Sequence, residues 1–127
     1  MIEDLSSSGV EKINFVGGEP MLHPHLEAWI VAAKSCGLTT SIVSNGTKMT
    51  EEWLTKMRPY LDWLGLSIDA SNDEMHFLMG RGLKGEIASG FSRHLERSKE
   101  VWQIAQRLGY GLKLNTVVTS VNADDDM

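Results

Sequence analysis

Four short apolar runs, each followed by polar residues, alternate along the chain with segments of helical periodicity. The runs are 4 to 8 residues long, and the second, Leu-Thr-Thr-Ser-Ile-Val-Ser, is rich in β-branched residues. Such runs are typical of buried strands. We therefore predict four strands, at 13–16, 38–44, 61–68 and 112–119.

Apolar residues recur every three or four positions in the segments between these runs, which predicts helices with one buried face, at 23–37, 50–59 and 86–108. Thr50 is suited to cap the second helix, and Gly37 and Gly109 to end the first and the third. Residues 1–10 resemble the end of a further helix, and the segment 71–85, rich in glycine and charge, is predicted to be a loop.

The alternation of strands and helices predicts an α/β fold with parallel strands and right-handed crossovers. The chain has 127 residues, of which 42% are hydrophobic and 23% charged, as in an ordinary globular domain. No linker, repeat or low-complexity segment divides it. Residues 1–127 are therefore predicted to belong to a single domain.

Composition excludes several classes of function. The net charge is −5 and the 12 Lys and Arg are scattered, which argues against a nucleic-acid surface. No apolar run approaches the roughly 20 residues of a membrane-spanning helix, and the first residues lack the pattern of a signal peptide. The one cysteine, Cys36, excludes an internal disulfide, and a reducing, cytoplasmic location is expected.

Polar residues follow every predicted strand. Gly17-Gly18-Glu19-Pro20 follows the first, where two glycines admit close approach of a ligand and the carboxylate can receive an ammonium group. The carboxyl ends of parallel strands meet at one edge of a sheet. We therefore predict one polar rim, to which the later strands contribute Ser44, Asn45, Gly46, Ser67, Asp69, Lys113, Asn115 and Thr116.

Simpler roles compete with these assignments. A Gly-Gly-Glu sequence alone is more often a turn, Asn45 suits a left-handed turn, Asp69 suits a helix cap, and Arg81 suits a solvated loop. His23 and His25 open a helix and are interpreted as surface or capping residues, and Cys36 as a core or surface residue. The acidic run 124–126 lacks the glycine and distal glutamate of a calcium loop. Trp53, Trp63 and Trp102 are predicted to be packing residues.

The strand ends carry a family resemblance. Gly17-Gly18-Glu19-Pro20, a Ser-Asn-Gly after the next strand and a Ser-x-Asp after the third resemble the radical S-adenosylmethionine enzymes. Four longer segments, and the ending at 121–127, are similar to the viperin family of antiviral nucleotide-modifying enzymes: Lys12 to Pro20, Ser41 to Gly46, Gly80-Arg81-Gly82, and Lys113-x-Asn115-x-Val117. The resemblance extends from residue 12 to residue 127.

The resemblance implies a partial (β/α)6 barrel, of which this chain covers about four strands as the central part of one domain. It implies a four-iron–four-sulfur cluster, served by a reductant, that cleaves S-adenosylmethionine to a 5′-deoxyadenosyl radical. In the viperin family this radical takes a hydrogen from the ribose of CTP, and loss of water yields 3′-deoxy-3′,4′-didehydro-CTP, a lyase-type reaction. The resemblance leaves CTP or UTP open as the nucleoside triphosphate.

Carried over to matching positions, the resemblance implies that Gly17, Gly18 and Glu19, followed by Pro20, hold the ammonium group of the cofactor. Ser67 and Arg81 match the residues that hold its carboxylate, Asn45 is expected to contact the cofactor or line the pocket, and Asp69 is expected to contact a ribose. Lys113 and Asn115 match residues that face the triphosphate. They alternate with leucines and so share one strand face, and a lysine pointing into a barrel needs an anion. No catalytic residue and no metal ligand is assigned within the chain.

The sequence also departs from the family. The Cys-x-x-x-Cys-x-x-Cys that binds the cluster lies upstream of the Gly-Gly-Glu strand in these enzymes, whereas no cysteine precedes residue 12 here. We expect the chain to be an internal piece of such an enzyme, inactive alone and prone to association through its two strand edges. Val16 stands where the animal proteins have serine, which leaves the nucleotide open. The alternatives are a radical enzyme that modifies a peptide or small molecule, and a non-catalytic remnant that acts as a binding module.

Overall fold

Four parallel strands form one sheet in the computed structural model, which describes residues 9–17, 19–68, 71–78, 83–89 and 93–116. Their order in the sheet is β1-β2-β3-β4, the same as their order in the sequence. The predicted α/β fold with parallel strands is therefore confirmed. The strands are β1 (Lys12–Phe15), β2 (Thr39–Ser44), β3 (Trp63–Ser67) and β4 (Gly111–Asn115).

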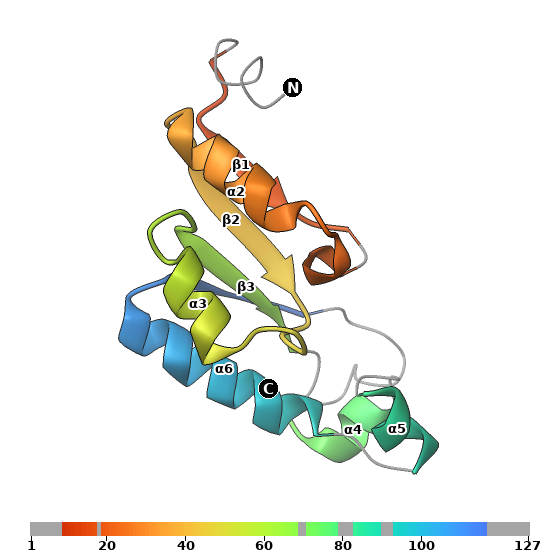
Figure 1. The fold of residues 1–127 in the computed structure, drawn as a ribbon. Helices are drawn as coiled ribbons and strands as arrows, with labels where there is room; N and C mark the ends of the chain where they lie inside the picture. Colours follow the sequence, from red (N-terminus) through yellow and green to blue (C-terminus); the bar gives the residue numbers. More distant parts are fainter. Residues whose placement is uncertain (1–8, 18, 69–70, 79–82, 90–92, 117–127) are drawn as a thin grey trace.

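The three longer connecting helices all lie on one face of the sheet (Figure 1). This follows from the strand order, because right-handed crossovers between successive neighbours put each helix on the same side. A sheet with helices on one face only is part of a barrel wall rather than a doubly wound sheet. The helices are η1 (Pro20–Leu22), α2 (Leu26–Ser35), α3 (Glu51–Met57), α4 (Asp73–Leu78), α5 (Lys84–Ala88) and α6 (His94–Leu108).

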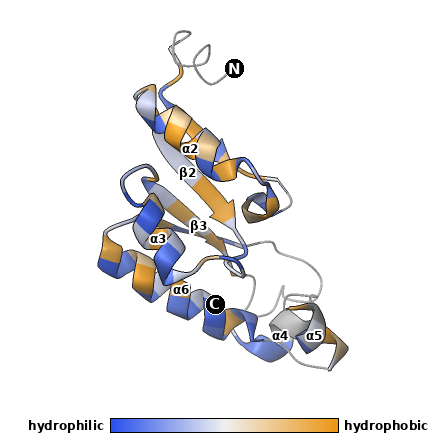
Figure 2. Cartoon of the chain, in the orientation of Figure 1, coloured by the Kyte–Doolittle hydropathy of each residue, from blue (hydrophilic) through white to orange (hydrophobic). Residues whose placement is uncertain are grey.

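The hydrophobic core lies between the sheet and these helices. Ile42, Leu64 and Leu66 of the strands pack with Ile30 of α2 and Leu54 of α3, all fully buried. Helix α6 buries Val101 and Ala105 together with the polar His94 and Ser98, and hydrophobic and hydrophilic patches alternate along it (Figure 2). The apolar periodicity of the sequence therefore corresponds to this single core.

Several predicted boundaries are wrong. The segment 71–85 is not a plain loop, because α4 lies within it and α5 begins in it. The single helix predicted at 86–108 is two, since α5 ends at Ala88 and α6 begins at His94. The sequence between them contains Gly90, and glycine is a poor helix former.

The first helix begins at Leu26 instead of His23, because Pro24 favours an extended residue before it, and His23 has φ −79° and ψ 126°. The predicted helix at 1–10 lies outside the described residues, except for its last two positions.

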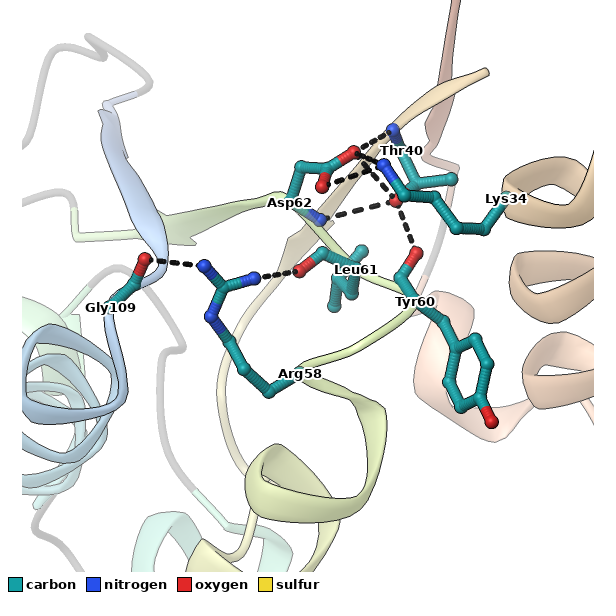
Figure 3. A network of polar contacts seen from close by, with 7 residues as sticks. All are labelled: Lys34, Thr40, Arg58, Tyr60, Leu61, Asp62 and Gly109. Atoms are coloured by element: carbon teal, nitrogen blue, oxygen red, sulfur yellow. Dashed lines mark hydrogen bonds and ion pairs between the residues drawn. The ribbon is translucent and has the colours of Figure 1, made fainter. Parts of the chain in front are cut away.

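Polar contacts join the amino ends of the strands (Figure 3). Lys34 Nζ donates to both carboxylate oxygens of Asp62, at 2.9 and 2.8 Å, and the Thr40 backbone N–H donates to Asp62 Oδ2 at 2.9 Å. Arg58 donates to three backbone carbonyls, those of Leu61, Leu108 and Gly109. The edge of the sheet at the amino ends of the strands, opposite the predicted rim, is therefore stabilised by charged side chains that bind other groups of the protein.

The helices of the described residues are all too short or too polar to cross a membrane.

Candidate cofactor and substrate site

Glu19 joins the carboxyl ends of β1 and β2. Its Oε1 accepts hydrogen bonds from Ser44 Oγ at 2.7 Å and from the Met21 N–H at 3.2 Å, and its Oε2 accepts from the Asn45 N–H at 2.8 Å. All three donors are neutral. A carboxylate has about four acceptor positions, so one remains on Oε2. The half-buried Glu19 is thus held in place by the chain and keeps capacity for one further donor.

The residues around Glu19 give it an open approach. Gly17 has φ +96°, a conformation that favours glycine, and, its chain neighbours apart, no atom of a described residue lies within 4 Å of the place a Cβ would occupy. Pro20 is buried and begins η1, which Glu19 caps. Gly18 lies outside the described residues. The backbone beside the carboxylate therefore leaves room for a ligand.

Asn45 closes a turn with its side chain instead of a left-handed backbone. Its Oδ1 accepts from the Thr47 N–H at 3.0 Å and from Thr47 Oγ1 at 2.5 Å. No described residue other than glycine has a positive φ, and Gly46 takes that conformation at +79°. The left-handed interpretation of Asn45 is wrong, and its backbone N–H serves to orient Glu19.

The carboxyl end of β3 is fixed by a buried histidine that the sequence analysis missed. His94 is 1% exposed, and its Nε2 donates to the Ser67 carbonyl at 2.7 Å. Strand β2 has turned away at this level, so the imidazole replaces the missing strand partner of that carbonyl. Ser67 pairs in register with Asn115. Asp69 and Arg81, the other predicted residues of this region, lie outside the described residues.

The sheet face opposite the helices, called here the inner face, carries the remaining candidates. Side chains alternate along a strand, and the register places one set from every strand on this face. Lys113 and Asn115 share it, as their spacing predicts. The inner face comprises Lys12, Asn14, Thr39, Ser41, Val43, Trp63, Gly65, Ser67, Gly111, Lys113 and Asn115.

Two ammonium groups lie over one aromatic ring on the inner face. The Nζ atoms of Lys12 and Lys113 are 5.7 and 5.9 Å from the ring centroid of Trp63, within the range of cation–π attraction. The Lys113 amine beside it, together with a smaller effect of desolvation, lowers the pKa of Lys12. Among the described residues, neither lysine has a carboxylate partner. Sequence analysis did not assign Lys12 to the site, although its alternation with Asn14 along β1 is a usable signal.

Trp63, predicted from the sequence to be a packing residue, does not belong to the core between the sheet and the helices. It is 38% exposed and lies on the inner face. The ring faces Gly111, its register partner on β4, where a Cβ would stand 2.5 Å from the nearest indole atom. The indole therefore occupies space that only glycine leaves open.

The two parts of the site suit different ligand groups. The carboxylate of Glu19 at the carboxyl edge can accept from an ammonium group, and the lysines of the inner face can bind an anion. No group of three His, Cys, Asp or Glu among the described residues is arranged to hold a metal ion. Cys36 follows α2 and lies near the amino ends of the strands, away from the rim. The geometry thus provides for an amphoteric small molecule at the carboxyl edge and a polyanion on the inner face.

The strands are parallel and in sequential order, the helices lie on one side, and the candidate ligand rim lies at the carboxyl edge. These features define part of a (β/α) barrel of the kind found in enzymes. The Radical SAM superfamily matches residues 1–127. The chain belongs to this superfamily.

Relatives of known name are nucleotide dehydratases. The chain is 38% identical over 127 residues to an S-adenosylmethionine-dependent nucleotide dehydratase of Lacinutrix mariniflava, and this match covers 100% of the chain and 26% of that protein. It is 42% identical over 114 residues to one from a Thermoplasmatales archaeon, covering 90% of the chain and 38% of the relative. The dehydratase RSAD2 of Siniperca chuatsi is 35% identical over 128 residues, covering 97% and 34%. The chain thus spans about a quarter to two fifths of the length of these relatives.

The fold has a solved counterpart in the structure titled "Native anSMEcpe with bound AdoMet". The TM-score is 0.71 with 19% sequence identity, and the match covers 97% of this chain and 34% of that one. At this identity the likeness shows the fold alone.

Proposed function

We propose that the protein to which this chain belongs is an S-adenosylmethionine-dependent nucleotide dehydratase. It converts a nucleoside triphosphate, CTP or UTP, to its 3′-deoxy-3′,4′-didehydro form in antiviral defence, and the chain forms the central part of its barrel domain. The observation that carries the proposal is the pairing of two sites on one sheet, with the carboxylate of Glu19 at the rim and the amines of Lys12 and Lys113 on the inner face. The names of the relatives agree with it.

Glu19 and its neighbours suit the amino-acid part of S-adenosylmethionine. The free acceptor position on Glu19 Oε2 would take the methionine ammonium, and Gly17 and Gly18 would let the cofactor approach the backbone. Ser67 and Arg81 would hold its carboxylate, while Asn45 and Asp69 would line the same site. When bound to a reduced four-iron–four-sulfur cluster, the cofactor supplies a 5′-deoxyadenosyl radical.

The cluster needs several thiolate ligands, which this chain does not provide. Its one cysteine, Cys36, lies near the amino ends of the strands. The cluster ligands would therefore come from other parts of the longer protein. A reducing, cytoplasmic environment and a protein reductant are parts of the same proposal.

Lys113, Asn115 and Lys12 would bind the triphosphate. Two unpaired ammonium groups repel each other, and a polyphosphate removes that repulsion while making charge-assisted hydrogen bonds. Asn115, at the end of β4, can donate from its amide. These residues would hold the nucleotide so that its ribose lies toward the rim, where the cofactor binds.

Product analysis of the full-length protein tests the proposal. The protein is reconstituted anaerobically with iron and sulfide and supplied with S-adenosylmethionine, a reductant and each of the four ribonucleoside triphosphates. Mass spectrometry should find 5′-deoxyadenosine together with CTP or UTP lighter by one water molecule. Deoxyadenosine without an altered nucleotide would move the protein to another reaction class, and neither product would favour a binding module.

Two substitutions separate the proposed sites. Arg81→Ala should weaken S-adenosylmethionine binding, and Lys113→Ala should weaken nucleotide binding, each by about tenfold or more because a charge-assisted hydrogen bond is lost. Lys99→Ala, on the exposed side of α6, is the matched control and should change neither affinity. An unchanged nucleotide affinity in Lys113→Ala would contradict the triphosphate assignment.

A further inference from the structure

The amines of Lys12 and Lys113 both lie over the indole ring of Trp63. Lys12 reaches it from β1, across the intervening strand β2, and Lys113 reaches it from β4. Lys113 pairs in register with Gly65, which lies two residues beyond Trp63 along β3. Lys12 pairs with Thr39, which lies two residues before Ser41 along β2, and Ser41 is the β2 partner of Trp63. The two lysines thus start from levels above and below the ring and converge on it.

The position of the ring is set by the neighbouring strand. Gly111 stands directly beside Trp63 in register, and a Cβ there would lie 2.5, 2.6 and 2.9 Å from three indole carbons. Real Cβ atoms do not come so close, so any other residue would displace the ring. Ser41, the register partner on the other side, is fully buried although it lies on the inner face. Side chains of adjacent strands therefore cover the sheet at this level.

Only the indole offers these amines an attractive partner among the described residues. The amines repel each other, and the described part of the chain gives neither of them a carboxylate. The face of an indole attracts cations more strongly than that of other aromatic side chains. Without the ring, two flexible lysines on an open face would move apart.

We propose that Trp63 is a positioning residue that holds Lys12 and Lys113 together as one binding site for a polyphosphate. This inference rests on the proposed function, because it assigns the triphosphate of the nucleotide to the surface formed by Trp63, Lys12 and Lys113. Trp63 acts by positioning the two amines, and Gly111 beside it leaves open the space that the indole ring occupies.

Binding of inorganic tripolyphosphate to the full-length protein tests this role by titration calorimetry. Trp63→Leu should lower the affinity by about five- to tenfold, because the π face is lost. Trp63→Phe should restore most of the affinity, since it keeps a smaller aromatic face. Gly111→Ala should weaken binding as Trp63→Leu does, although every tryptophan is retained, because the new Cβ displaces the ring. Trp29→Phe, at a 40% exposed tryptophan on α2, is the matched control and should bind normally.

Tryptophan fluorescence gives a second measurement. Its emission would not change on ligand binding through Trp63 if that residue had a purely structural role. Tripolyphosphate should change the tryptophan emission of the original protein and of Trp29→Phe, and this change should be absent in Trp63→Phe. If Trp63→Leu does not fold, Gly111→Ala and the emission change decide the question.

The outcomes separate this inference from the proposed function. Weak binding in Lys113→Ala with normal binding in Trp63→Leu and Gly111→Ala overturns the role of Trp63 and leaves the triphosphate assignment intact. Normal binding in all three overturns both. Weak binding in all three, with rescue by Trp63→Phe, supports the positioning role.

Discussion

Two carboxylates at opposite ends of the strands differ in the charge of their donors. Asp62, at the amino end, receives the ammonium of Lys34 on both oxygens. From the residues that the structure describes, Glu19 at the carboxyl end receives only the neutral donors of Ser44, Met21 and Asn45. An ionised carboxylate without a cation is electrostatically unsatisfied, which is suited to binding a ligand. Asp62 is therefore a structural residue, and Glu19 has the properties of a binding residue.

Asp62 should make stability depend on pH in the acidic range. Burial, the largest single influence, raises the pKa of its carboxyl, but the hydrogen bonds from Lys34 and Thr40 outweigh it and leave the pKa below the usual value of 3.8. A lowered pKa in the folded state adds stability that is present above the unfolded pKa and is lost as pH falls through the folded pKa.

We expect the free energy of unfolding of the full-length protein to fall as pH drops below about 4, with a shallower fall in Asp62→Asn. Urea unfolding from pH 7 to pH 3 measures this. Glu52→Gln, at an exposed position of α3, serves as control and should keep the original slope. Equal slopes for Asp62→Asn and the original protein would contradict the role assigned to the Lys34 pair.

At the scale of the secondary-structure elements, the end of α6 shows how one side chain can join three segments. The helix ends at Gly109, which has φ +86°. Arg58, just after α3, donates from Nε to the Leu108 carbonyl at 3.0 Å and from an Nη to the Gly109 carbonyl at 2.9 Å. It thereby satisfies carbonyls that a helix end leaves without partners. The same guanidinium donates to Leu61, which leads into β3.

Arg58→Ala should lower the free energy of unfolding by about 1–3 kcal/mol, because helix-end carbonyls lose a charged donor. Arg107→Ala is the matched control near the same helix end. Arg107 pairs with Glu51, and both side chains are 61% exposed. Such surface pairs contribute at most about 1 kcal/mol and often nothing measurable. Denaturant unfolding of both variants in the full-length protein compares them, and an equal loss would show that the Arg58 contacts are unimportant.

The sequence predicts element order well and some contacts poorly, for a common physical reason. The strands and the first two helices depend on local periodicity, and Thr50 caps α3 by accepting from the Trp53 N–H as expected. Besides Gly90 between the two helices, the start of α6 has a partner distant in sequence, because Asp73 Oδ1 accepts from the Leu95 N–H. Local periodicity contains no information on such a contact.

The candidate site shows the same division. Gly17 and Glu19 follow the end of β1, and Lys113 alternates with leucines along β4; both features are visible in the sequence. Lys12 and His94 do not, because their roles depend on the pairing register and on the packing of α6 against β3. Trp63 was misassigned because an aromatic residue in a strand gives no indication of which face it occupies. The strand register, once known, resolves the positions of Lys12 and Trp63, whereas that of His94 depends on how α6 packs against β3.

At the scale of the whole molecule, the described sheet has two outer strands. β1 and β4 each pair with one neighbour in the described part of the chain. Large apolar side chains are exposed close to them, with Val16 60%, Leu22 67% and Leu114 52% accessible. Unpaired strand edges beside apolar surface promote association.

The 127-residue chain produced alone should therefore associate in a concentration-dependent way. Sedimentation velocity at several concentrations measures this, with the full-length protein as the comparison. A chain that stays monomeric at high concentration while its fold is intact would show that these edges are already protected.

The strand order has a consequence for how the chain is built. Each strand pairs with the one that precedes it in the sequence, so no strand must wait for a distant partner to be synthesised. During translation, β2 can dock on β1 as soon as β2 itself has emerged after α2, and each later unit can add to a sheet that already exists. The inner face with its lysines would be completed last, when β4 leaves the ribosome and Gly111 meets Trp63.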